Sequence, residues 1–122
     1  MTTLQDVARD FSAMILAGRF EEAAEKYWAD DVTIMEPANL PDGTPAVVRG
    51  LRSARARLTQ WLAHSAMDDL SIDGPFVTGD QFALFIDTEI MLRETGARRS
   101  FSEIAVYTVR NGKIIEERYF YS

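Results

Sequence analysis

Apolar residues in the first half of the chain recur every three or four positions, which is the spacing of a helix that buries one face. The first stretch of this kind begins after Thr3, a suitable N-cap, and ends at Gly18, because a glycine commonly terminates a helix. A second helix is predicted from Phe20 to about Trp28, and a third from about Gly50 to Ala66.

After Met67 the pattern changes to an alternation of apolar and polar residues, which is the period of a strand. Four strands are predicted here: Leu70–Val77, Gln81–Leu92, Arg99–Arg110 and Lys113–Tyr121. The pair Asn111-Gly112 is a strong signal for a tight hairpin. One more short strand, Val32–Glu36, precedes a proline-rich loop from Pro37 to Val48. Helices followed by an antiparallel meander predict an α+β fold, with helices packed on one face of a sheet.

Composition limits the kinds of protein that this chain can be. Its 122 residues are the size of one domain, which we expect to span residues 1–122. The absence of cysteine excludes disulfides, thiolate nucleophiles and cysteine-bound zinc. The net charge of −6 repels phosphate backbones, so no nucleic-acid partner is expected.

The chain also carries no sequence signal for a membrane. Its first residues lack the basic and apolar regions of a signal peptide, and no apolar run approaches the ~20 residues that a membrane span needs. We therefore expect a soluble cytoplasmic protein without a membrane partner.

Three segments carry a resemblance to a known superfamily. They are LAGRF at residues 16–20, YWADDVT at residues 27–33, and the closing stretch from Glu103 to Tyr121. Together with the order of elements they resemble the SnoaL-like and ketosteroid-isomerase-like members of the nuclear transport factor two superfamily. The resemblance implies a cone-shaped, strongly curved antiparallel sheet, wrapped around three N-terminal helices and enclosing a pocket. It also implies a homodimer through the outer face of the sheet.

Glu36 is the sharpest candidate for chemistry. It stands directly before Pro37, at the position of the carboxylate base of the ketosteroid isomerases. A carboxylate there can move a proton at a carbon next to a carbonyl if burial raises its pKa toward neutrality; the alternative is a solvated strand end. Phe11 and Ala105 replace the two donors that such isomerases direct at the enolate oxygen. Because the loss of one such donor typically costs ~10²–10³ in rate, we do not expect steroid isomerisation.

The strand Gln81–Leu92 has one wholly apolar face and one mixed face. A mixed face of this kind usually faces water. The resemblance instead places the mixed face, with Phe85, Asp87 and Glu89, on the wall of the pocket. The apolar face would then meet a second subunit.

The last two strands add further residues to the expected pocket wall, and most of them are acids or phenols. The residues concerned are Glu103, Ala105, Tyr107, Glu117 and Tyr119. Carboxyl groups crowded in a low dielectric cannot all ionise, so some of their pKa values are raised and one of them can serve as a general acid. The alternative is that half of them are ordinary exposed residues balanced by arginines. Trp28 and Trp61 are aromatic residues of the pocket wall or of the core.

Other kinds of site find less support in the sequence. Tyr119 stands where a limonene-epoxide hydrolase has an aspartate, so that reaction is disfavoured. His64 is the single histidine and cannot form a histidine-rich metal site. Arg52, Arg55 and Arg57 on the third helix permit an anion site, but ion pairs on a solvated face explain them more simply.

These observations lead to one leading hypothesis and two alternatives. We expect a SnoaL-like protein that binds a small apolar or aromatic molecule and uses neither a metal nor a cofactor. If it is an enzyme, Glu36 works with Glu89, Glu103 or Asp87 as acid and base, in the manner of isomerases and SnoaL-like cyclases, and Tyr107 and Tyr119 donate hydrogen bonds. The alternatives are a non-catalytic ligand-binding module and a dimeric interaction protein whose pocket is filled by its own side chains.

Overall fold

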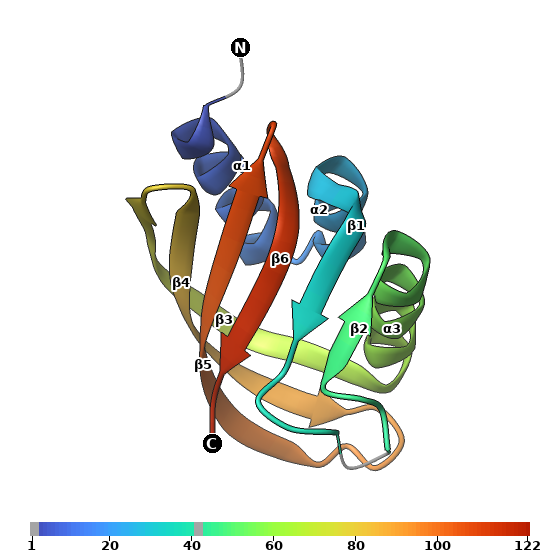
Figure 1. Cartoon of the computed structure of the whole chain (residues 1–122). Coiled ribbons are helices and arrows are strands. Elements are labelled where there is room, and N and C mark those ends of the chain that lie inside the picture. The colour runs from blue at the N-terminus through green and yellow to red at the C-terminus, as the bar shows by residue number, and fades with distance from the viewer. Residues whose placement is uncertain (1–2, 41–42) are drawn as a thin grey trace.

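The helices begin and end close to where their sequence signals lie. The computed structural model describes residues 3–40 and 43–122, and within them forms α1 (Leu4–Leu16), α2 (Phe20–Tyr27) and α3 (Leu51–His64) (Figure 1). Thr3 caps α1: its hydroxyl accepts from the Asp6 N–H at 3.1 Å, and the Asp6 carboxylate accepts from the Thr3 N–H at 3.1 Å. The chain leaves α1 through Gly18, whose φ of 76° lies in the left-handed region.

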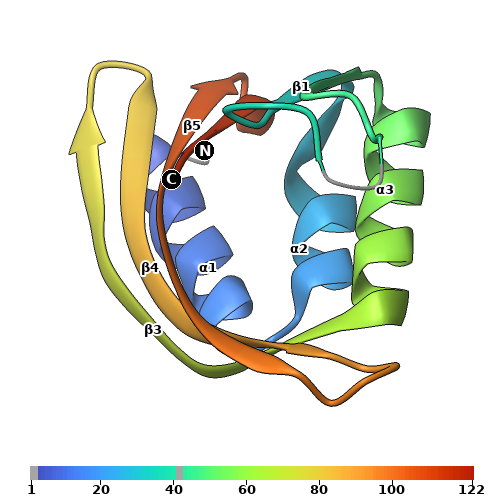
Figure 2. The same ribbon diagram turned by 90° about the horizontal axis from the view of Figure 1, so that it is seen from below.

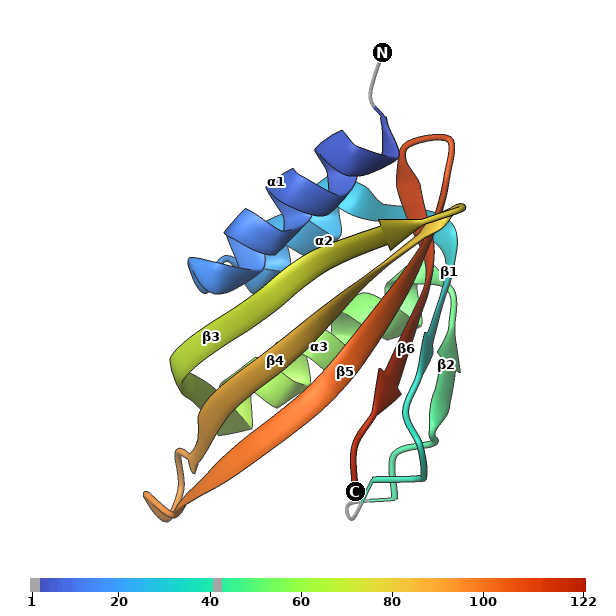
Figure 3. The ribbon, with the colours of Figure 1, turned by 90° about the vertical axis from the view of Figure 1, so that its left-hand side faces the viewer.

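The strands form one curved sheet. They are β1 (Trp28–Met35), β2 (Val47–Arg49), β3 (Ser65–Thr78), β4 (Gln81–Leu92), β5 (Arg98–Arg110) and β6 (Lys113–Phe120). Their order is β2-β1-β6-β5-β4-β3. All neighbours are antiparallel except β1 and β6, which run in the same direction. The long strands β3, β4 and β5 run side by side (Figure 3), and the helices lie on the concave side of the sheet (Figure 2). The predicted α+β class and the curved sheet are confirmed.

Some boundaries differ from the sequence prediction because strands take their bounds from their partners. β1 begins at Trp28, earlier than predicted, since Trp28 already pairs with Ile114 of β6. The three-residue strand β2 begins at the end of the predicted loop and runs one residue beyond it, and it pairs with the end of β1. β3 begins directly after α3 because Ser65 pairs with Leu92. Pro41, one of the prolines behind the loop prediction, lies outside the described residues.

The core lies between α1, α2 and the concave face of the sheet. Phe11 of α1 meets Tyr107 of β5 edge to face, with ring centroids 5.0 Å apart, and Phe82 of β4 stacks on Tyr107 at 4.7 Å. Leu84 and Ile86 follow Phe82 on the same buried face of β4. Complete burial of such a side chain contributes about 1.5–3 kcal/mol, so the apolar face of β4 belongs to the core.

The two faces of β4 are therefore the reverse of what the resemblance implied. Phe85 and Asp87 are exposed on the outer face of the sheet, and Glu89 lies on the same face. The expectation that the mixed face lines a pocket and the apolar face meets a second subunit is wrong. The general rule for a strand with one apolar face was the better guide, because the helices supply the apolar surface that this face needs.

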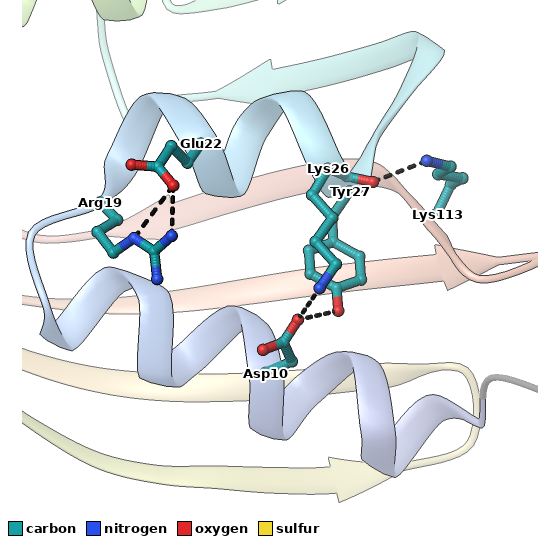
Figure 4. A network of polar contacts seen from close by, with 6 residues as sticks. All are labelled: Asp10, Arg19, Glu22, Lys26, Tyr27 and Lys113. Carbon is teal, nitrogen blue, oxygen red and sulfur yellow. Dashed lines mark hydrogen bonds and ion pairs between the residues drawn. The ribbon is translucent and has the colours of Figure 1, made fainter.

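A surface network of charges joins α1 to α2, and we call it the helix network (Figure 4). Its members are Asp10, Arg19, Glu22, Lys26, Tyr27 and Lys113. The Lys26 ammonium donates to Asp10 at 2.6 Å, and the Tyr27 hydroxyl donates to the same carboxylate. Arg19 pairs with Glu22, and Lys113 donates to the carbonyl of Lys26 at 2.7 Å. The two contacts of Asp10 join α1 to α2, and that of Lys113 joins β6 to the end of α2.

Candidate functional site

Acids and phenols from β1, β5 and β6 converge on the concave side of the sheet. We call this set the interior acid cluster: Trp28, Glu36, Arg57, Glu103, Tyr107, Glu117, Tyr119 and Tyr121. The sheet register explains the convergence. Tyr107 of β5 pairs with Glu117 of β6, and Glu117 pairs in turn with Ile34 of β1. Since alternate residues of a strand share a face, Glu103 joins Tyr107 on the same inner face.

Glu117 is the most deeply buried acid of the cluster, with only 3% of its surface exposed. Its two carboxyl oxygens accept from the Trp28 indole N–H and from the Tyr119 hydroxyl. Burial raises its pKa to about 7, and repulsion by Glu36 adds to that rise, while the two hydrogen bonds act in the opposite direction. Glu117 is therefore close to half-protonated at neutral pH.

Glu103 carries the larger shift of the two acids. Burial is the main cause that raises its pKa to about 8, and repulsion by Glu36 and Glu117 adds to it. At neutral pH this carboxyl group is mostly protonated, so it can donate a hydrogen bond or a proton.

Glu36 forms an ion pair with Arg57 of α3. The Arg57 Nη2 donates to the Glu36 Oε1 at 2.9 Å, and only 14% and 16% of the two side chains are exposed. The backbone N–H of Glu36 donates to the carbonyl of Ala46 at 2.7 Å, which ties the end of β1 to the segment before β2. The second terminal nitrogen of Arg57, Nη1, is buried and has no hydrogen-bond partner within residues 3–40 and 43–122.

The phenols of the cluster stay protonated. Burial, together with the charge of Glu117, raises the pKa values of Tyr107 and Tyr119 well above the usual range. Burial and the neighbouring Glu36 carboxylate raise the pKa of Tyr121 in the same direction. All three hydroxyl groups are therefore donors, and that of Tyr119 is already taken by Glu117.

The structure brings together most of the residues that the sequence singled out. Those in the interior acid cluster are Trp28, Glu36, Glu103, Tyr107, Glu117 and Tyr119. Ala105 is fully buried between Glu103 and Tyr107, and Phe11 packs against the ring of Tyr107. Trp61 lies half-buried on α3. Neither Phe11 on α1 nor Ala105 on β5 has a side chain that can donate a hydrogen bond to an enolate oxygen.

Three predicted residues lie elsewhere. Asp87 accepts from the Ser102 hydroxyl on the outer face, and Glu89 pairs with Arg98 at 3.1 Å on the same side. Phe85 is exposed beside them. These residues point away from the cluster, so the hypothesis that Glu89 or Asp87 serves as its acid or base is wrong.

Sequence reasoning missed Arg57, which it assigned to a solvated helix face. A signal was present: Arg57 follows the buried Ala54 by three residues and precedes Leu58, so it belongs to the inner face of α3. Arg52 and Arg55 lie on the exposed face as expected.

Among the hollows of the described surface, two adjoin the elements discussed above. One, of about 330 Å³, lies beside the helix network; the other, of about 440 Å³, lies between the segment Thr44–Arg49 and α3 and is lined in part by Arg57. Among the described residues, no three histidine, cysteine or acidic side chains are grouped so as to hold a metal ion. No helix in the described ranges is long and apolar enough to cross a membrane.

The fold and the arrangement of the helices define an α+β protein of the type seen in nuclear transport factor two. The family model of the SnoaL-like domain matches residues 1–121. The chain therefore belongs to the SnoaL-like family, as its sequence resemblance implied. A comparison with curated proteins finds no match.

Solved structures agree with this assignment. A protein from Mesorhizobium loti, provisionally described as a SnoaL-like polyketide cyclase, is 38% identical, with a TM-score of 0.88 over 98% of this chain and 99% of that chain. A protein of the nuclear-transport-factor-two-like type from Burkholderia pseudomallei is 16% identical, with a TM-score of 0.82 over 100% and 92%. TerC, co-crystallised with polyporic acid, is 18% identical, with a TM-score of 0.74 over 92% and 85%.

Proposed function

We propose that this protein binds a small carbonyl compound against the interior acid cluster and catalyses proton transfer at the carbon next to the carbonyl, without a metal or a cofactor. One observation carries the proposal. Glu103 and Glu117 share a largely buried interior, and their pKa values are about 8 and about 7. A group that exchanges protons most effectively has a pKa near the working pH.

The roles of the acids follow from their surroundings. Glu36, next to Arg57, accepts the proton from the carbon, and the electron pair of the broken C–H bond moves toward the carbonyl carbon. The electron pair of the C=O π bond moves onto the carbonyl oxygen, which takes the proton of Glu103 and becomes the hydroxyl group of an enol. If a proton returns to a different carbon, the overall reaction is an isomerisation. If the enol carbon instead attacks a second carbonyl group of the same molecule, the overall reaction is a cyclisation.

The wall around these acids suits an apolar or aromatic ligand. Phe101 of β5 and Tyr121 are half-buried, and their ring centroids lie 5.1 Å apart. Aromatic and aliphatic walls with a few polar groups are typical of small-molecule sites. The Mesorhizobium loti relative, described as a polyketide cyclase, supports a substrate with several carbonyl groups.

Hydrogen–deuterium exchange tests this function. Deuterium uptake next to the carbonyl of 1,3-dicarbonyl probes is followed by proton NMR, with and without protein. We expect the wild type to accelerate uptake, and Glu36→Gln and Glu103→Gln each to lower the rate by about 10²-fold or more. Glu89→Gln is the matched control, because it makes the same change on the outer face. No acceleration by the wild type, or equal rates in all variants, would contradict the proposal.

The non-catalytic alternative makes a different prediction for the same probes. It predicts that native mass spectrometry detects a retained ligand while exchange stays at the rate of the protein-free sample. In that case the buried acids would serve binding alone.

The outer face of the sheet supports a homodimer as part of the proposal. Ile104 pairs in the sheet register with Phe85 on one side and with Phe120 on the other, and all three side chains are exposed. A continuous apolar row of this kind is a common interface between subunits. Sedimentation should give a dimer for the wild type and a monomer for Ile104→Glu; a monomeric wild type would contradict the dimer.

A further inference from the structure

Arg57 is the one guanidinium of the interior acid cluster, and half of its terminal donors have no partner. Nη2 donates to Glu36 at 2.9 Å. Nη1 is buried, and no acceptor within residues 3–40 and 43–122 meets it. A buried donor without a partner costs about 1–3 kcal/mol, and more when it is charged. Such a group in a folded protein calls for a physical explanation.

The ion pair with Glu36 holds the guanidinium in place. Because the guanidinium is planar and rigid, fixing Nη2 also fixes the direction in which Nη1 donates. The same side chain lines the hollow of about 440 Å³ between the segment Thr44–Arg49 and α3. Arg57 thus contacts Glu36 and also lines the hollow, while its Nη1 atom itself is buried.

Protonation of the deeper acids limits the negative charge that a ligand meets in the cluster. Glu36 compensates the charge of Arg57 directly. Near neutral pH Glu103 is mostly protonated and Glu117 about half-protonated, since burial and then repulsion by neighbouring acids raise their pKa values to about 8 and about 7. When protonated they can donate to an incoming oxygen instead of repelling it.

We propose that Arg57 Nη1 binds an anionic oxygen of the ligand, so that this protein takes small planar molecules that carry a carboxylate or an enolate. The inference deepens the proposed function, because it names the class of substrate for the same cluster. It also supplies from α3 a donor for the enolate oxygen, in place of the two that are missing at Phe11 and Ala105. A charge-assisted hydrogen bond of this kind is about twice as strong as a neutral one.

Binding of matched charged and neutral probes tests the inference. Benzoate is compared with benzamide, and the enolate of 1,3-cyclohexanedione with cyclohexanone, by NMR titration of the isotope-labelled protein at neutral pH. We expect the anionic member of at least one pair to bind tenfold or more tightly than its neutral partner. A preference within the first pair identifies a carboxylate ligand, and one within the second an enolate ligand.

Substitutions then assign the preference to Arg57. Arg57→Gln should remove it, whereas Arg55→Gln, the same change at an exposed position of the same helix, should keep it. If Arg57→Gln does not fold, the double variant Glu36→Gln/Arg57→Gln removes both buried charges and should also show no preference. A wild type that binds no probe, a wild type without preference, or a preference kept in the Arg57 variants would overturn the inference.

This test is separate from that of the proposed function. Its readout is affinity, whereas the exchange experiment reads turnover. Lost exchange in Glu103→Gln together with an unchanged preference in Arg57→Gln would leave the proposed chemistry standing and remove the inference. A preference that depends on Arg57, without any catalysed exchange, would support the anion site and contradict the proposed chemistry.

Discussion

The helix network and the interior acid cluster are both built from carboxylates, phenols and cations, yet they balance charge in opposite ways. In the helix network each acid meets a cation near the surface: Asp10 meets Lys26, and Glu22 meets Arg19. The interior acid cluster holds three largely buried carboxyl groups but a single guanidinium, that of Arg57, which pairs with one of them. Balanced surface charges add little to stability, whereas unbalanced buried ones shift pKa values toward neutrality.

The pKa values express this difference. Hydrogen bonds from Lys26 and then Tyr27 lower the pKa of Asp10. Burial raises the pKa values of Glu103 and Glu117. Perturbed groups of the second kind gather at functional sites, because a fold keeps such a costly arrangement where its chemistry is used. The comparison therefore favours a packing role for the helix network, and it supports our proposal of a function for the interior acid cluster.

The largest effect at neutral pH is expected from breaking the buried ion pair. Arg57→Met leaves the Glu36 carboxylate buried without its counter-ion, so it should lower the free energy of unfolding by about 3 kcal/mol. Urea denaturation measures the change. The double variant Glu36→Gln/Arg57→Met, which removes both charges, should lose less than the single variant. A loss below ~1 kcal/mol in the single variant would contradict this expectation, because exposed ion pairs typically contribute no more than that.

An intermediate effect at neutral pH is expected from the titration of Glu103. Its pKa is about 8 in the folded chain and near 4.5 in the unfolded chain, so the folded state holds the proton between these values. The free energy of unfolding should therefore fall as pH rises from 4.5 to about 8. Glu103→Gln removes this fall, and its stability relative to wild type should rise by on the order of 4 kcal/mol from pH ~5 to ~9.

Glu89→Gln is the control for that measurement. Its carboxylate lies on the outer face beside Arg98, so its stability should run parallel to that of the wild type over the same pH range. Parallel curves for Glu103→Gln as well would show that the interior does not hold a proton.

The smallest effect is expected in the helix network. Lys26→Met removes an exposed cation from Asp10, so the urea midpoint should shift much less than in the Arg57 variant, and less still at high salt. Its pH dependence has the opposite sign to that of Glu103. Because folding lowers the pKa of Asp10, this contribution is present above the unfolded value of 3.8 and is lost as pH falls below it. If the urea midpoint of Lys26→Met shifts more than that of Arg57→Met, the helix network contributes more to stability than the buried ion pair, contrary to our expectation.

Much of the fold could be predicted from local sequence signals. The Thr3 cap, the bounds of β4 and the Asn111-Gly112 hairpin before β6 depend on residues close together in the chain, and the structure has all three. The curved α+β architecture followed from the order of the elements and from the family resemblance. Of the candidate site, Glu103 and Glu117 were identified from the alternation along their strands, whereas Glu36 was identified from its place before Pro37 in the family resemblance.

Only the tertiary structure decided which face of each element turns inward and which partner each buried charge meets. The alternation along β4 separates Phe82 from Phe85, but the packing of α1 against the sheet determines that Phe82 is buried. The same holds for Arg57, whose role depends on Glu36, 21 positions earlier in the chain. Periodicity is a local property of the chain, whereas burial and charge balance depend on residues that folding brings together from distant positions.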